Sequence, residues 1–296
     1  METLELLTDT LKTTQEIQSI VRVMKSLSAV SITQFETAVD ALGAYRVTVE
    51  QGLQVVLHRF HVENGRLPPN LLTDPTGREG YVVIGSDRGM CGRFNETIAA
   101  FANDKLASPK EAPMLSVAGL RVAARLKTAG HCTDRLFTLP GSVEGLTELA
   151  HSILIQIDRW QRDHGVQTIH VLHNHRGDQS RAEPGAAQLL PVPEAELARL
   201  AQTEWPGPSL PCFTMPPDSL LSWLVRQRMF LGVYEALAQS LASEHAARLA
   251  AMQAADRNIQ ERREELEARY RQKRQENITR ELLDIVAGFE AAGSGD

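Results

Sequence analysis

Apolar residues in the first sixty positions recur at alternating spacings of three and four. The clearest run is Phe35, Val39, Leu42, Arg46, Val49, Leu53, Val56 and Phe60, in which Arg46 is the polar exception. Leu4, Leu7 and Leu11 begin the same pattern near the start. This repeat is typical of a coiled-coil seam. It predicts a long helix that ends near Asn64-Gly65 and would measure roughly 90 Å if continuous.

A second long helix is predicted after Pro216-Pro217, because all 14 prolines lie between Pro68 and Pro217 and proline disrupts helix interiors. It carries two apolar stripes: Leu231, Tyr234, Leu237 and Leu241, and then Ile278, Leu282, Ile285 and Phe289. Neither helix can bury its stripe alone. The chain runs from the first helix into the middle domain and then back along the first helix as the second, so we expect the two helices to pack antiparallel.

The middle of the chain alternates between strand and helix patterns. Strands are predicted at 81–84, 114–117 and 168–173, helices at 94–106, 120–128 and 145–164, and an edge strand at 188–192 before a proline-rich loop. Such alternation favours a small, mostly parallel sheet. The predicted fold class is α+α/β: a long antiparallel two-helix coiled coil formed by both termini (1–67 and 217–290) and a central Rossmann-like α/β domain (75–215).

Composition narrows the class of protein. Hydrophobic residues make up 43% and charged residues 23% of the 296 residues, and the formal net charge is −6. These values are normal for a globular protein and do not favour nucleic acid as the partner. No segment approaches the ~20 apolar residues that span a bilayer. The acidic N-terminus does not resemble a secretory signal, so we expect a protein inside the cell or peripheral on the inner side of a membrane.

The turn from Gly85 to Gly92 follows the first predicted strand and precedes a helix. Glycines at such a position can let backbone amides approach a phosphate. The turn lacks the Gly-Lys-Ser/Thr ending of a P-loop and the acidic residue of a dinucleotide fingerprint. We therefore interpret it as a structural turn formed by Asp87, Arg88, Gly89 and Gly92, and expect no cofactor there.

Two other groups of residues invite a chemical interpretation. His170, His173 and His175 could suggest a metal site, but no carboxylate or cysteine lies at a supporting spacing, so an exposed strand end explains them better. Cys91 lies beside Arg88 and Arg93 and could be a thiol of lowered pKa. A small buried turn residue is the favoured interpretation.

Three segments together resemble the gamma subunit of F-type ATP synthases. Residues 20–30, IVRVMKSLSAV, are similar to the family's KITKAMKMVAA helix, and residues 86–92, SDRGMCG, to its SDRGLCG turn. Residues 243–256, SEHAARLAAMQAAD, with 274–286, RQENITRELLDIV, look like its SEQAARMVAMKAATDN and RQASITQELTEIV. Their order and separation also match, so the likeness covers nearly the whole chain.

The resemblance implies a non-catalytic rotor. Its two helices would occupy the cavity of a 3:3 hexamer of alpha and beta subunits, and its foot would sit beside epsilon on the membrane ring of c subunits. Ion flow would turn the shaft and drive ATP synthesis at the beta subunits, and hydrolysis would reverse it. The protein would be peripheral on the cytoplasmic side of the cell inner membrane.

Carried over residue by residue, the resemblance implies partner contacts at six positions. Met24 and Arg248 would lie where the helices face a beta subunit, with a seam position as the alternative for Met24. Polar contacts with the hexamer would come from Arg274, Gln275, Thr279 and Glu281.

The chain also departs from the family pattern. Ser31-Ile32-Thr33 stands where the family usually has a lysine, and Arg93-Phe94-Asn95 replaces glycine-leucine-asparagine. These departures suggest the alternate branch of F-type ATPases that is often linked to sodium. Two rival classes stay open: a nucleotide-binding α/β enzyme dimerised by the coiled coil, and a coiled-coil scaffold with no rotary role.

Overall fold

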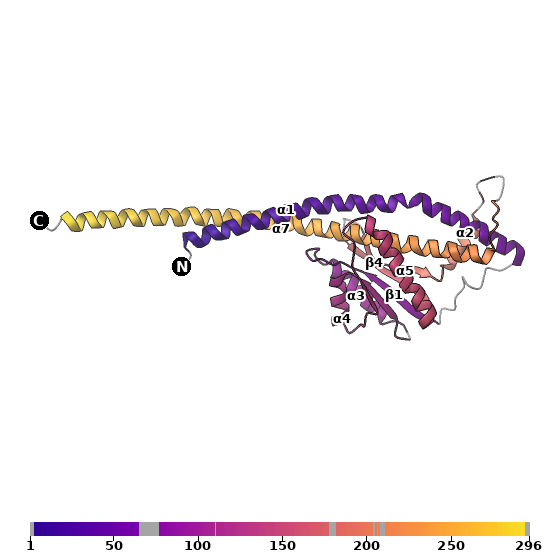
Figure 1. The fold of residues 1–296 in the computed structure, drawn as a ribbon. Helices are drawn as coiled ribbons and strands as arrows, with labels where there is room; N and C mark the ends of the chain where they lie inside the picture. Colours follow the sequence, from indigo (N-terminus) through magenta and orange to yellow (C-terminus); the bar gives the residue numbers. More distant parts are fainter. Residues whose placement is uncertain are drawn as a thin grey trace. The chain divides into compact units, whose positions relative to one another are not determined.

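The computed structural model describes residues 3–64, 77–109, 111–177, 182–203, 205, 207 and 211–293. Two compact units divide the chain. One contains residues 28–248, and the other pairs residues 1–27 with 249–296. This division differs from the predicted three segments, because each unit contains parts of both terminal helices. Figure 1 shows the elements along the chain.

The N-terminal arm is interrupted once. Helix α1 spans Leu4–Ala41 and α2 spans Gly43–Asn64, whereas the repeat predicted one helix. At the break the amide of Leu42 donates to Val39 O (3.1 Å), and helical bonding resumes with Arg46 N–H to Leu42 O (2.8 Å). The bond from Leu42 to Val39 spans three residues instead of four, so the backbone tightens for one turn only. Leu42 still packs against the apolar clusters, and the heptad repeat continues through the break.

Helix α7 spans Pro217–Gly293 without interruption, as the absence of proline predicts. In the unit of residues 28–248 its stripe from Leu231 to Leu241 is buried, and so are the α1 and α2 positions Phe35, Val49, Leu53 and Val56. Contacts pair Tyr45 with Gln227 and Arg46 with Glu235, while Phe35 stacks on His245. From Phe35 to Tyr45 the partners on α7 fall from His245 to Gln227, so the predicted antiparallel pairing is confirmed.

The α/β part of this unit contains a five-stranded sheet in the order β3-β2-β1-β4-β5. The strands are β1 (Arg78–Ile84), β2 (Met114–Ala118), β3 (Arg135–Phe137), β4 (Val166–Arg176) and β5 (Ala182–Leu190). The first four are parallel, and β5 pairs antiparallel with β4 at the edge. The predicted mostly parallel sheet is therefore confirmed.

Helices cover both faces of the sheet. Helices α3 (Phe94–Leu106) and α4 (Leu120–Thr128) pack on the face that contains Tyr81 and Val83. Helix α5 (Glu144–His164), together with α1 and α7, covers the face that contains Val82 and Ile84. Successive residues of β1 are thus buried on opposite faces, which explains the uninterrupted apolar run that predicted this strand.

Two elements were not predicted. Strand β3 has only three residues, of which Arg135 and Leu136 are exposed, so it shows little hydrophobic pattern. Helix α6 (Glu194–Gln202) lies in the stretch interpreted as a loop. Its Leu197 and Leu200 pack with Leu53 and Val56 of α2 in a separate apolar cluster. The predicted edge strand at 188–192 starts earlier, at Ala182, and ends at Leu190.

Gly119 offers a test of how tightly the carboxyl ends of β1 and β2 pack. Its φ is +116°, and a Cβ there would lie 2.8 Å from the backbone nitrogen of Ser86. We expect Gly119→Ala to lower the free energy of unfolding by more than about 2 kcal/mol, since both the conformation and the contact are unfavourable. Urea unfolding of the full chain measures this. Gly43→Ala is the control, because beyond its adjacent residues and the nearby backbone of its own helix nothing lies within 4 Å of the position that its methyl group would take. Equal losses for the two variants would contradict the interpretation.

Candidate functional site: the junction of α7 with the strand ends

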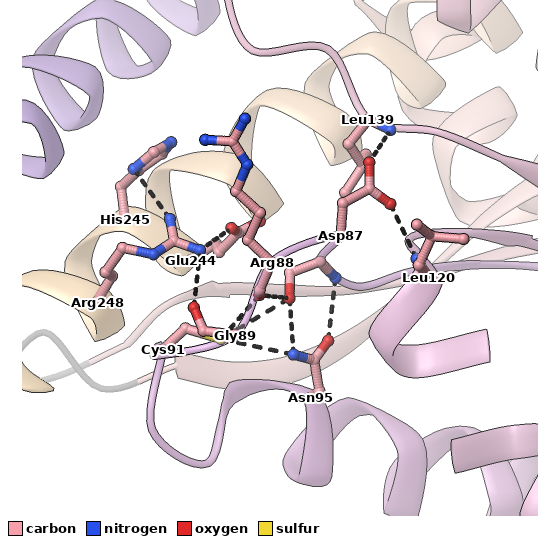
Figure 2. Close-up of polar contacts among 11 residues, drawn as sticks. Asp87, Arg88, Gly89, Cys91, Asn95, Leu120, Leu139, Glu244, His245 and Arg248 are labelled. Carbon is pink, nitrogen blue, oxygen red and sulfur yellow. Dashed lines mark hydrogen bonds and ion pairs between the residues drawn. The ribbon is translucent and has the colours of Figure 1, made fainter. Parts of the chain in front are cut away.

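The turn after β1 is held together by the carboxylate of Asp87. Its Oδ1 accepts the amide of Leu120 at the start of α4 (2.9 Å), and its Oδ2 accepts the amide of Leu139 after β3 (2.7 Å). One side chain therefore ties together the loops that follow three parallel strands (Figure 2). This geometry supports the structural interpretation of the turn.

Asn95 at the start of α3 completes the turn. Its Oδ1 accepts the amide of Ser86 (3.0 Å), and its Nδ2 donates to Ser86 Oγ (2.7 Å). The Ser86 hydroxyl in turn donates to the carbonyl of Arg88 (2.8 Å). Met90 and Gly92 adopt left-handed φ values of 61° and 58°, which let the chain reverse within the turn. The predicted turn residues Asp87, Arg88, Gly89 and Gly92 thus lie in one compact turn, whose polar contacts are shown in Figure 2.

Cys91 lies beneath this turn. Its side chain is buried, and Asn95 Nδ2 donates to its Sγ at 3.5 Å. Burial raises the pKa of the Cys91 thiol, and the nearby Glu244 carboxylate adds to the effect. The hypothesis of a thiol with lowered pKa is therefore wrong, because desolvation outweighs the lowering by the Ser86 hydrogen bond and by Arg248.

Helix α7 carries a buried ion pair next to the turn, and the arginine of this pair contacts the turn. Arg248 Nη2 lies 2.5 Å from Glu244 Oε1, and each side chain is only 7% exposed. The same Nη2 donates to the carbonyl of Gly89 at 3.4 Å. The glycine turn thus presents a carbonyl oxygen to a guanidinium, whereas a phosphate site would present amides to an anion.

The ion pair changes the acid–base behaviour of its surroundings. Burial raises the pKa of Glu244, and the Arg248 guanidinium opposes that rise. Burial also lowers the pKa of His245 to about 4, with further lowering by Arg248 and Arg88. The His245 ring stacks on Phe35 of α1, with ring centroids 5.8 Å apart. A neutral imidazole suits this apolar contact.

Further contacts fix α7 on β4 and α2. Ser243 Oγ donates to the carbonyl of His175 (3.3 Å), and Gln239 Oε1 lies 3.1 Å from His173 Nε2. Gln239 Nε2 donates to Glu235 (3.1 Å), which also pairs with Arg46 at 2.5 Å. Arg46, the polar exception in the predicted seam, thus connects α2 to α7 and, through Gln239, to the sheet.

The position of α7 bears on the nucleotide hypothesis. Strand order reverses between β1 and β4, and in open α/β sheets ligands bind in the crevice outside the strand ends at such a point. Here the turn that follows β1 and the end of β4 contact α7, through Gly89 and His175 respectively. The protein's own helix therefore lies against the edge of the sheet at which a nucleotide would bind.

The three histidines of β4 do not gather around one point. His173 and His175 share a strand face, with ring centroids 6.3 Å apart, whereas His170 stacks on Tyr81. Among the described residues no group of three or more His, Cys, Asp or Glu side chains could hold a metal ion. The same part of the chain contains no helix with the length and apolar character to cross a membrane.

The residues with predicted partner contacts fall into two groups. Arg274, Gln275, Thr279 and Glu281 are exposed on α7, and Met24 of α1 is half-buried. Arg248 is buried, and its guanidinium is bound within the chain. The side chain of Phe289 lies outside the described residues, while Ile278, Leu282 and Ile285 are exposed. Contact of these residues with another subunit stays a prediction.

Sequence reasoning missed the roles of Glu244, His245 and Asn95. Glu244 and Arg248 stand one helical turn apart in a stretch otherwise rich in alanine and leucine. Charged residues at that spacing inside an apolar stretch indicate a buried pair, and this signal could have identified them. Nothing in the sequence placed Asn95 against Ser86.

Comparison with known proteins agrees with this architecture. A family model described as ATP synthase matches residues 3–292. The chain belongs to the ATP synthase gamma-subunit family. Among solved structures, it is similar to a chain of the Euglena gracilis mitochondrial ATP synthase OSCP/F1/c-ring structure in rotational state 3. The identity is 15% and the TM-score 0.66, with 99% of this chain and 95% of that chain covered.

Two further structures share the fold of this gamma-family chain. The Euglena gracilis mitochondrial ATP synthase rotor in rotational state 1 matches at 15% identity and a TM-score of 0.62, covering 93% of this chain and 98% of that chain. The Tetrahymena thermophila mitochondrial ATP synthase central stalk and c-ring structure matches at 18% identity and a TM-score of 0.56, covering 80% and 99%. The likeness to these structures therefore extends over most of the chain.

The buried ion pair leads to a prediction about stability. Arg248→Ala leaves the Glu244 carboxylate buried without a partner, so we expect a loss of about 3–5 kcal/mol in unfolding free energy. The double variant Glu244→Leu/Arg248→Met should lose less than Arg248→Ala, because no buried charge remains. Urea unfolding of the full chain compares them. Arg262→Ala, which removes an exposed pair with Glu265, should cost under about 1 kcal/mol; a similar cost for Arg248→Ala would contradict the assignment.

The lowered pKa of His245 predicts a pH dependence. The pKa of this histidine is 6.5 in the unfolded chain and about 4 in the folded chain, so the unfolded chain binds the proton at a higher pH. The folded state therefore loses stability as the pH falls through this window. We expect His245→Gln to reduce that loss, measured by chemical unfolding at pH values of about 7, 5.5 and 4.5 that span the window. His164→Gln, at an exposed histidine, serves as control. An unchanged pH dependence in His245→Gln would contradict the burial argument.

Proposed function

We propose that this chain is the non-catalytic rotor of an F-type ATP synthase, coupling ion flow in the membrane to ATP synthesis or hydrolysis by rotation. Family membership supports the proposal, and so does the likeness of the fold to central-stalk and rotor structures. The observation that carries it is the way α7 is bound to the sheet. A helix of 77 residues contacts the ends of β1 and β4 and also pairs with α1 and α2.

These contacts suit the transmission of torque. A rotating shaft must not turn independently of the domain that drives it. Gln239, Ser243 and Arg248 bind α7 to the sheet and its turn at successive positions along the helix. Since directional hydrogen bonds resist twisting in a way that apolar contacts do not, this junction would pass torsion from the α/β part to α7.

The finer assignments belong to the same proposal. The partners would be a 3:3 hexamer of alpha and beta subunits, an epsilon subunit and the c ring, at the cytoplasmic side of the cell inner membrane. The similar Euglena gracilis structure comprises OSCP, F1 and the c-ring, and the Tetrahymena thermophila structure comprises the central stalk and c-ring. The contacts of α7 with the turn after β1 and the end of β4 support a subunit without a nucleotide site of its own.

Copurification distinguishes this proposal from its rivals. The chain expressed with the alpha and beta subunits of its own source should appear once per 3:3 assembly, with ATPase activity in the complex. A freely soluble homodimer that binds nucleotide by itself would favour the enzyme hypothesis. A homodimer without nucleotide affinity would favour the scaffold.

The exposed polar residues near the end of α7 give a prediction within the complex. We expect simultaneous replacement of Arg274, Gln275, Thr279 and Glu281 by alanine to reduce the ATPase rate of the assembly about tenfold, equivalent to ~1.4 kcal/mol. All four side chains are exposed in the free chain, so its melting temperature should change little. Alanine at the exposed Arg269 and Arg271 is the matched control. Equal rates for the two variants would contradict the assigned contacts.

A further inference from the structure

A polar layer interrupts the apolar seam in the unit formed by residues 1–27 and 249–296. Gln18 occupies a heptad position and is only 2% exposed. Its Nε2 donates to Asp256 Oδ1 (3.3 Å) and to Gln260 Oε1 (3.2 Å). Its Oε1 accepts from Arg263 Nη1 at 3.1 Å. The buried amide of α1 thus finds partners for both its donor and its acceptor on α7.

Asp256 receives three side chains of α1. Besides Gln18, Lys25 Nζ donates to its Oδ2 at 3.0 Å, and Arg22 Nε lies 3.6 Å from its Oδ1. The hydrogen bonds from Lys25 and Gln18 hold the pKa of Asp256 below its usual value. Donors from three positions along one helix converge on one carboxylate of the other, so the contact is satisfied at one alignment of the helices.

This layer contributes more to alignment than to stability. Apolar seam residues on either side of it are buried, Leu7 and Val21 on α1 and Met252 and Leu266 on α7. Apolar contacts of this kind tolerate a shift of one helical turn, since one apolar residue can replace another. A buried polar residue at one seam position specifies register at a cost in stability. Partly exposed ion pairs such as Arg22 with Asp256 add little stability of their own.

The alignment decides where the other side of α1 points. Ile17, Ile20, Val23 and Leu27 are 48%, 60%, 58% and 62% exposed, and they follow one another along the helix away from Gln18 and Lys25. Turning α1 about its axis would move this apolar stripe into the seam or sideways. If the rotation of α1 about its own axis is fixed, this stripe stays on the outside of the helix pair. Met24 directly follows Val23 of the stripe in the sequence.

We propose that Gln18 and Asp256 are positioning residues that set the axial register and the rotational phase of α1 residues 4–27 on α7. At one alignment of the two helices the polar groups of this layer all have hydrogen-bond or ion-pair partners, and any other alignment would leave some of them without one. The register follows from contacts within the chain itself. Its consequence, that misalignment loosens the coupling of rotation to catalysis, rests on the proposed rotor function.

Spin-label distances in the full chain test the register. Labels replace Ser19 of α1 and Arg262 of α7, both exposed, after the exposed Cys132 and Cys212 are changed to serine. The otherwise unaltered chain should give one narrow distance. Gln18→Leu should give a broadened or second distance, displaced by about 5 Å, one helical turn, while its melting temperature stays equal or rises.

Val21→Ala is the matched control at the adjacent seam position. Removing buried apolar volume should lower the melting temperature by a few degrees and leave the single distance unchanged. A merely structural Gln18 would behave like Val21, with a lower melting temperature and no second distance. That result for Gln18→Leu would overturn the proposal.

The assembled complex tests the consequence. With Gln18→Leu, ATP hydrolysis should persist while the number of ions pumped per ATP falls about twofold or more relative to Val21→Ala, because a misaligned shaft transmits less of each step. Asp256→Asn should show the same direction, and Glu276→Gln, which alters an exposed carboxylate bound within α7, should not. A displaced distance with unchanged pumping would retain the register assignment and contradict its proposed consequence for coupling, whereas an assembly of the unaltered chain that hydrolyses ATP but pumps no ions would contradict the rotor function. An undisplaced distance would reject the register assignment itself.

Discussion

The pairing of the two terminal helices is the constraint on which the rest of this structure depends. Each helix carries an apolar seam that is too long to leave exposed to water. Burying the seams together brings the two terminal helices side by side and forces the middle of the chain to fold as an insertion between them. Polar residues such as Arg46 and Gln18 interrupt the seams where each finds a specific partner on α7.

The α/β part has the strand order of a nucleotide-binding domain, with a helix of the same chain against the carboxyl ends of its strands. Its parallel strands end at a glycine-containing turn, at the point where strand order reverses. Ser243 and Arg248 of α7 occupy that point and bind the strand ends directly. A fold that elsewhere holds a small molecule at this edge here holds a long helix, which explains how a Rossmann-like domain can serve a mechanical function.

The charged groups at this junction are buried, and their contribution is geometric. The Glu244–Arg248 pair loses hydration on burial, so it provides little net stability relative to apolar residues of the same size. It does, however, orient the Arg248 guanidinium, which donates to the Gly89 carbonyl of the turn while it is paired with Glu244 of its own helix. The same reasoning applies to Gln18 and Asp256 along the coiled coil, where satisfied polar groups select one alignment among several apolar ones.

The elements that have a long repeat or a clear boundary could be predicted from the amino-acid sequence alone. The heptad positions predicted the terminal helices, and helices α3 and α4 were predicted with the bounds that the structure gives them, because their apolar periodicity is regular and turn residues flank them. The SDRGMCG turn and the other segments resembling the gamma family also predicted the family that the comparisons support. Only the tertiary structure revealed β3, α6, the break at Leu42, and the contacts of Asn95, Glu244 and Asp87. Most of these features depend on neighbours distant in the sequence or on elements too short to show a period; only the Glu244–Arg248 pair left a local signal, in its spacing within an apolar stretch.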